Sequence, residues 1–138
     1  MARILIVDNE DAYRTTLSKL FSREGHETRC ASSGPEAIAL GMEFRPEALV
    51  VDWGLRGPCD GLDVSRELQI EDPNLRVLLI TGHSAADVDE AAKARIFRIL
   101  EKPFGLDEMS EALASALDAA LHSVLDSPLG SAPNSRSS

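Results

Sequence analysis

Four polar side chains each follow a short apolar run of the sequence, and their chemical types suit the handling of a phosphoryl group. Two are carboxylates, one is a hydroxyl and one is an ammonium: Asp8, Asp52, Thr81 and Lys102. Carboxylates, completed by carbonyl oxygens and water, are the ligands that Mg²⁺ prefers in proteins. A carboxylate beside Mg²⁺ can attack a phosphoryl group as a nucleophile. The ammonium and the hydroxyl can then bind the negatively charged phosphoryl oxygens.

The elements that position these side chains are an alternation of buried strands and amphipathic helices. Apolar runs predict strands at Ile4–Val7, Ala48–Val51 and Val77–Ile80. Weaker patterns predict a short, more polar strand nearer an edge at Glu27–Ala31 and a further strand at Ile96–Leu100. Helical spacing predicts helices at Tyr13–Phe21, Pro35–Met42, Leu62–Glu71, Ala85–Ala94 (capped by Ser84) and Leu106–Val124. This order favours a doubly wound α/β fold, with a five-stranded parallel sheet in the order 2-1-3-4-5 and helices on both faces. The carboxyl ends of such strands meet at one edge, so the four side chains should share a crevice there.

Length and composition limit what else the chain could be. It has 138 residues, a formal net charge of -9 and two cysteines, Cys30 and Cys59. We therefore expect one domain, no disulfide framework and a cytoplasmic location. The acidic charge argues against direct nucleic-acid binding, and no apolar run approaches the roughly 18–20 residues of a membrane span. The Ser- and Pro-rich residues 126–138 are expected to be a disordered tail, and Met1 suggests a nearly natural start.

Four sequence motifs resemble those of response-regulator receiver domains of two-component systems, in the family order. They are Ile4-Leu5-Ile6-Val7-Asp8-Asn9-Glu10, Ala48-Leu49-Val50-Val51-Asp52, Leu79-Ile80-Thr81-Gly82 and Glu101-Lys102-Pro103-Phe104. Each motif alone is weak, but four at strand ends with near-family spacing are specific. The resemblance covers nearly all of residues 1–125, which we interpret as a stand-alone, chemotaxis-regulator-like receiver domain with the flavodoxin-like strand order.

The resemblance implies a role for each site residue. Asp52 would accept a phosphoryl group from a sensor histidine kinase or a histidine phosphotransfer protein, with Thr81 and Lys102 contacting that group. The metal, Mg²⁺, would be held by Asp8, Asn9, Asp52 and the backbone carbonyl of Gly54. The Lys102–Pro103 peptide bond would be cis. The protein would signal by contact with an unknown downstream protein, and would be no enzyme beyond self-phosphotransfer and autodephosphorylation.

Three departures from the family pattern bear on this interpretation. Asn9 stands where the family usually has a second acid, which should weaken metal binding. Arg56 stands where a proline is usual, and the following loop is one residue longer; its side chain either approaches a phosphoryl group or points into solvent. Ile99 replaces the usual switch aromatic. We expect Phe97 to share its face, because residues two apart in a strand do so, and an aromatic switch coupled to Thr81 is therefore not expected.

Other interpretations remain open beside this one. Gly54 offers no side chain to shield an aspartyl phosphate from water, so the phosphoryl group should last minutes rather than hours. A phosphate-independent interaction module (a pseudo-receiver) is the main alternative function. A phosphatase is disfavoured because Gly54 stands where a second acid would be needed. A homodimer through the last two helices is a further interpretation, with Arg95 and Arg98 pairing with acidic residues across it.

Overall fold

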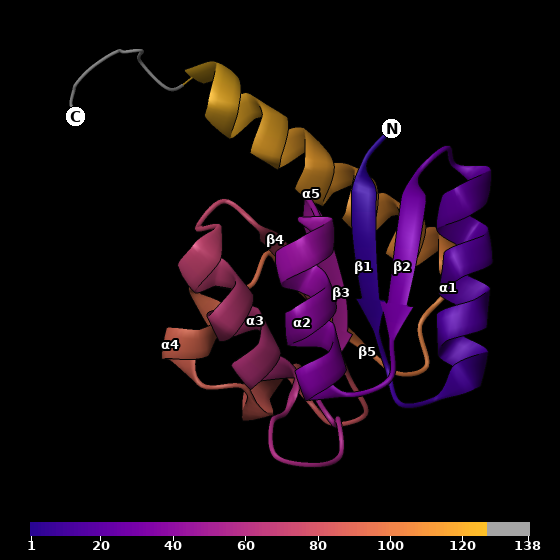
Figure 1. Cartoon of the computed structure of the whole chain (residues 1–138), viewed down its shortest axis with the longest axis vertical. Helices are drawn as coiled ribbons and strands as arrows, with labels where there is room; N and C mark the ends of the chain where they lie inside the picture. The colour runs from indigo at the N-terminus through magenta and orange to yellow at the C-terminus, as the bar shows by residue number, and fades with distance from the viewer. Residues whose placement is uncertain (127–138) are drawn as a thin grey trace.

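The computed structural model describes residues 1–126, with side chains described up to Ala119. The strands are β1 (Arg3–Val7), β2 (Glu27–Ala31), β3 (Ala48–Asp52), β4 (Arg76–Thr81) and β5 (Arg98–Glu101). The helices are α1 (Asp11–Arg23), α2 (Gly34–Phe44), α3 (Gly61–Glu71), α4 (Glu90–Lys93) and α5 (Leu106–Asp126), and a 3₁₀ turn, η1 (Ala85–Asp87), precedes α4. Figure 1 shows this alternation along the chain.

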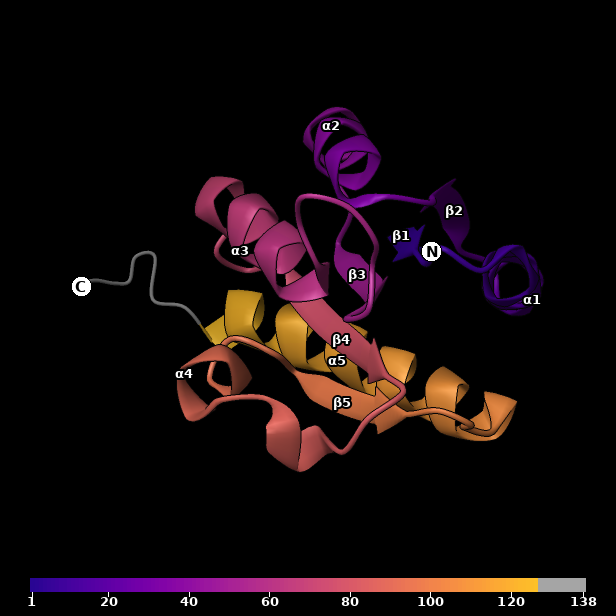
Figure 2. The same ribbon diagram turned by 90° about the horizontal axis from the view of Figure 1, so that it is seen from below.

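The strands form one parallel sheet in the order β2-β1-β3-β4-β5, as predicted from the sequence. Helices α1 and α5 cover one face, and α2, α3 and α4 cover the other (Figure 2). Successive side chains of β1 point to opposite faces of the sheet. Ile4 and Ile6 pack in the core under α1 and α5, and Leu5 and Val7 pack in the core under α2, α3 and α4. No helix among residues 1–126 is long and apolar enough to span a bilayer.

The segment between β4 and β5 differs from its sequence prediction. In place of one helix over Ala85–Ala94, the chain forms η1 and then the single short helix α4. Ser84 caps η1 as expected, since its Oγ accepts from the Ala86 N–H at 3.1 Å. Val88 is then extended and buried, and Asp89 starts α4 by accepting from the Ala92 N–H. Burial of Val88 and this second cap split the expected helix.

The prediction that Phe97 and Ile99 share a face is wrong. Phe97 packs against the core under α1 and α5, whereas Ile99 packs against the core under α2, α3 and α4. The reason is that β5 begins at Arg98, so Phe97 lies before the strand, where alternation does not yet apply. The tail prediction for residues 126–138 lies outside the described residues, except that Asp126 is the last residue of α5.

Candidate functional site

The carboxylates of Asp8 and Asp52 meet because β1 and β3 are neighbouring strands in register. Val7 pairs with Val51, which places the two following aspartates side by side at the carboxyl edge of the sheet. Lys102 reaches the same point from the end of β5. Its Nζ lies 3.5 Å from Asp8 Oδ2 and 3.8 Å from Asp52 Oδ1. Both carboxylates are nearly inaccessible to solvent, at 1% and 7% exposure of the side chain.

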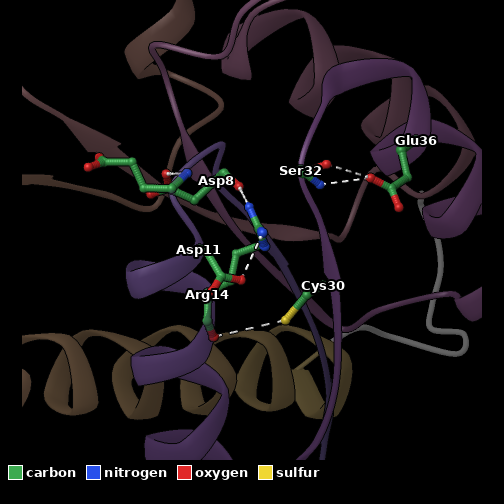
Figure 3. A network of polar contacts seen from close by, with 7 residues as sticks. Asp8, Asp11, Arg14, Cys30, Ser32 and Glu36 are labelled. Carbon is green, nitrogen blue, oxygen red and sulfur yellow. Dashed lines mark hydrogen bonds and ion pairs between the residues drawn. The ribbon is translucent and has the colours of Figure 1, made fainter.

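Asp8 is held by its backbone and by one of its two carboxylate oxygens. Asp8 Oδ1 accepts from the Glu10 N–H at 2.8 Å. Arg14 Nη1 donates to the Asp8 carbonyl at 2.6 Å, and Arg14 Nη2 also contacts Asp11, as Figure 3 shows. The second oxygen, Asp8 Oδ2, is buried and has no hydrogen-bond partner among the described residues. It is therefore the oxygen available to a ligand beside Lys102.

Lys102 has two further partners that the sequence motifs did not reveal. Its Nζ donates to Glu10 Oε1 at 2.9 Å, and it lies 4.1 Å from the centroid of the Tyr13 ring. That ring in turn contacts the ring of Phe104, with centroids 5.8 Å apart. In the sequence, Tyr13 only marked an apolar position of a helix. The sequence feature that could have indicated its contact with Lys102 is its position in the first turn of the helix that follows Asp8. In the fold, this turn of α1 packs against the loop that follows β5.

The remaining motif residues surround the two carboxylates. Thr81 ends β4 and is buried, and its Oγ1 accepts from the His83 N–H at 2.9 Å, so its own O–H remains able to donate. The Lys102–Pro103 peptide bond is cis, as expected. An open pocket of about 660 Å³ lies over this edge, lined by Asn9, Glu10, Asp52, Trp53, Gly54, Arg56, Thr81, Gly82, His83 and Lys102.

The loop between β3 and α3 leaves no room for a side chain at Gly61, beside the Asp52 carbonyl. It does leave room for one at Gly54, beside the Asp52 carboxylate. A Cβ on Gly61 would lie 2.3 Å from the Asp52 carbonyl oxygen, so only glycine fits at the first position of α3. Asp60 caps that helix through the N–H groups of Leu62 and Asp63. A Cβ on Gly54 would lie an ordinary 3.9 Å from Asp52 Oδ2. The exposed side chain of Arg56 lines the pocket as well, so both of its interpretations have a basis.

The electrostatics of the site favour a bound cation. Burial raises the pKa of Asp52, and the charge of Lys102 offsets this in part. Burial also raises the pKa of Asp8, and the charge of Asp52 adds to the rise. Burial alone would lower the pKa of Lys102, but its hydrogen bond to Glu10 and the charges of Asp52 and Asp8 raise it instead. Two carboxylates thus share one ammonium in a poorly solvated place, and a second cation would relieve them.

The residues present fit a magnesium ion. Mg²⁺ takes one or two protein carboxylates and keeps several waters. Asp8 Oδ2, which accepts no hydrogen bond among the described residues, and the neighbouring Asp52 carboxylate would supply the charged ligands. Asn9 and Gly54 line the same pocket and would supply neutral oxygens. Within residues 1–126, no group of three or more Asp, Glu, His or Cys side chains forms a metal cluster. The arrangement is therefore a two-carboxylate site rather than an all-protein cage.

Comparisons with known proteins agree with this geometry. The family model for the response regulator receiver domain matches residues 4–114. Sporulation initiation phosphotransferase F of Bacillus subtilis is 29% identical over 116 residues, covering 83% of this chain and 93% of that protein. Regulatory protein AtoC of Escherichia coli is 35% identical, and the match covers 83% of this chain but only 25% of AtoC. Among solved structures, response regulator protein TrrA of Thermotoga maritima in complex with Mg²⁺-BeF superimposes with a TM-score of 0.76 and 26% identity, covering 85% of this chain and all of TrrA.

Proposed function

Because this chain belongs to the response regulator receiver domain family, we propose that it works as a phosphorylation-dependent switch with Asp52 as the phosphoacceptor. Receiver domains of two-component systems are signalling domains, and such a switch acts by differing affinity for a partner in its two states. The observation that supports the proposal best is the Lys102 ammonium lying within 4 Å of both buried carboxylates. Burying two carboxylates beside each other lowers the stability of the folded protein. Such unfavourable arrangements are typical of functional sites, where the chemistry requires them.

In the proposed reaction, an oxygen of the Asp52 carboxylate attacks the phosphorus of a phosphohistidine. The new bond joins this oxygen to phosphorus while the bond from phosphorus to the imidazole nitrogen breaks, and the imidazole leaves with its electron pair. The donor is a sensor histidine kinase or a histidine phosphotransfer protein. Lys102 then neutralises phosphoryl charge from one side. Thr81 donates its O–H from the end of β4, since its Oγ1 already accepts from His83.

Asp8, Asp52, the Gly54 carbonyl and Asn9 are the groups that would hold Mg²⁺. A metal bound at this place would supply positive charge to the phosphoryl oxygens during transfer. The amide of Asn9 carries no full charge, so we expect weaker Mg²⁺ affinity than two adjacent acids would give. Glu10 does not replace the missing acid in the present arrangement, because its carboxylate is hydrogen-bonded to Lys102.

The proposal extends to partners and location. We infer that the chain acts in the cytoplasm and passes its signal by protein contact, and that it binds no nucleic acid directly. A homodimer through α4 and α5 is compatible with the exposed acidic side chains on those helices and with Arg95 and Arg98 beside them.

The test uses acetyl phosphate as a small phosphodonor. In the presence of Mg²⁺, the intact mass of the full chain should rise by one phosphoryl group, and EDTA should prevent the gain. Asp52→Asn should abolish it, while Asp118→Asn, which removes an exposed carboxylate on α5, should leave it unchanged. A chain that gains no mass under these conditions would instead be a phosphate-independent interaction module, and an equal gain in Asp52→Asn would show that Asp52 is not the phosphoacceptor.

A further inference from the structure

A second pocket opens at the opposite edge of the sheet, where β4 and β5 begin. It has a volume of about 470 Å³ and is lined by Gln69, Pro73, Leu75, Arg76, Val77, Ala94, Arg95, Ile96 and Phe97. Its lining residues come from α3, β4 and the segment after α4. Figure 2 shows α3 and α4 on the side of the molecule away from α1. Strand β4 runs from Arg76 here to Thr81 at the first site. At about 3.3 Å per residue, the two sites are roughly 17 Å apart.

The pocket concentrates positive charge that has no partner. Arg76 and Arg95 both line it, and neither has a carboxylate within ion-pair distance among the residues whose side chains are described. The chain as a whole carries a formal net charge of -9, so acidic partners are plentiful elsewhere on it. Two arginines left unpaired around one hollow therefore mark a local attraction for an anion.

Two polar atoms of the pocket residues are buried and have no hydrogen-bond partner within the described part of the chain: Arg76 Nε and Gln69 Oε1. Gln69 is fixed in orientation, because its Nε2 donates to the Leu75 carbonyl at 3.2 Å and to the Arg95 carbonyl at 2.9 Å. Its Oε1 is consequently an acceptor that lacks a donor. Buried polar atoms of this kind are rare in folded proteins and call for a partner from outside the chain, such as an ordered water, an ion or a ligand.

We propose that this pocket binds a small organic anion that carries a phosphate or carboxylate group together with a hydroxyl or amine donor. A guanidinium binds both kinds of oxyanion through paired N–H donors, which Arg76 and Arg95 supply. The donor of the ligand would satisfy Gln69 Oε1, and the apolar side chains of Leu75 and Phe97 would contact its carbon skeleton. The volume lies within the range typical of small-molecule sites, about 300–1,000 Å³.

The proposal does not depend on phosphorylation of Asp52, because the two pockets share no lining residue. A readout that resolves the two sites is therefore required, since an anion could also bind near Lys102. NMR of the full chain provides this readout. The Nε–H of Arg76 and the side-chain amide of Gln69 report on the second pocket, and Trp53 and Thr81 report on the first.

The probes are inorganic phosphate, glucose 6-phosphate and L-malate. We expect at least one organic probe to shift the Arg76 and Gln69 signals saturably, with a Kd below about 1 mM. It should bind about tenfold or more tightly than inorganic phosphate, which brings no comparable donor and carbon skeleton. Glucose 6-phosphate and malate distinguish a phosphate source from a carboxylate source of the oxyanion.

Matched variants test whether the named arginines do the binding. Arg95→Gln changes an exposed residue and should weaken binding about tenfold or more, as should Arg76→Gln, because each removes a charge-assisted hydrogen bond. Arg66→Gln, on the exposed face of α3, should not change it. The proposal is overturned if no probe shifts the two signals saturably, if phosphate binds as well as the organic probes, or if Arg95→Gln binds like the wild type.

Discussion

At the scale of single residues, the site is organised around the ammonium of Lys102. It contacts the carboxylates of Asp8, Asp52 and Glu10 and the face of the Tyr13 ring. The motifs identified the first two partners, because carboxylates at strand ends form a recognisable pattern. They could not identify Glu10 as a lysine partner or Tyr13 as a ring beneath the ammonium. Those contacts depend on side-chain conformations and on how α1 packs against the loop after β5.

Replacing Asp8 by Asn should stabilise the protein when no metal is present. Asp8 is buried beside Asp52, and its Oδ2, which accepts no hydrogen bond among the described residues, carries charge in a poorly solvated place. Thermal unfolding in EDTA should show a Tm a few degrees higher for Asp8→Asn than for the wild type. Mg²⁺ should raise the Tm of the wild type and should have little effect on the variant. A variant that is less stable in EDTA, or equally stabilised by Mg²⁺, would argue against a metal-binding carboxylate.

The difference in stability between Asp8→Asn and the wild type should depend on pH. Burial raises the pKa of Asp8 in the folded protein, so the stability linked to its protonation is present at low pH and is lost as the pH rises through the folded-state pKa. Without metal, the advantage of Asp8→Asn over the wild type should therefore be largest at neutral pH and should shrink as the pH falls towards acid. Urea unfolding of both proteins across this range measures the difference. A constant or growing advantage at lower pH would contradict the assignment.

Removing the ring of Tyr13 should slow phosphorylation. A cation–π contact is worth about 0.5–2 kcal/mol, so Tyr13→Leu should reduce the rate of acetyl phosphate labelling by roughly two- to thirtyfold as Lys102 loses its position. Tyr13→Phe retains the ring and should behave nearly like the wild type. Initial rates from intact mass spectra provide the comparison. Equal rates in Tyr13→Leu and Tyr13→Phe would show that the ring does not position Lys102.

At the scale of elements, the strands were predicted far better than the segment before β5. All five strands were predicted to within two residues at either end. Continuous apolar runs predicted the three central strands β1, β3 and β4, because these strands are buried on both faces. The helix predicted over Ala85–Ala94 is instead η1 and α4. The predicted helix is divided because Val88 is buried in an extended conformation and Asp89 caps a second helix. The tertiary packing of one side chain leaves no periodic pattern in the sequence, so this division could not be predicted.

The junction of β3 with α3 should tolerate no side chain at Gly61. A Cβ there would meet the Asp52 carbonyl at 2.3 Å, so Gly61→Ala should destabilise the fold by about 1–3 kcal/mol and disturb Asp52. Gly54→Ala is the matched control in the same loop, because its Cβ would lie 3.9 Å from Asp52 Oδ2 and should change stability little. Urea unfolding of the two variants tests the difference. Similar stabilities would mean that the loop adjusts freely around Asp52.

At the scale of the whole molecule, one sheet presents two edges with different chemistry. The carboxyl edge gathers buried acids around one lysine. At the opposite edge, Arg76 and Arg95 have no acidic partner among the side chains that the structure describes. The first edge could be predicted from the sequence, because four of the five strands place a polar residue of the site at or just after their carboxyl end. The second could not, because Gln69, Arg76 and Arg95 come from unrelated positions and form no motif. Strand β4 joins the two edges, with Arg76 at its start and Thr81 at its end.

The most direct test of the proposed switch is whether Asp52 is the carboxylate that accepts the phosphoryl group. Borohydride reduces an aspartyl phosphate to homoserine and thereby marks the modified position permanently. After treatment with acetyl phosphate and Mg²⁺ and then with borohydride, peptide mass spectrometry should find homoserine at position 52 and at no other aspartate. Homoserine at Asp8 or another acid, or none at any position, would contradict the account.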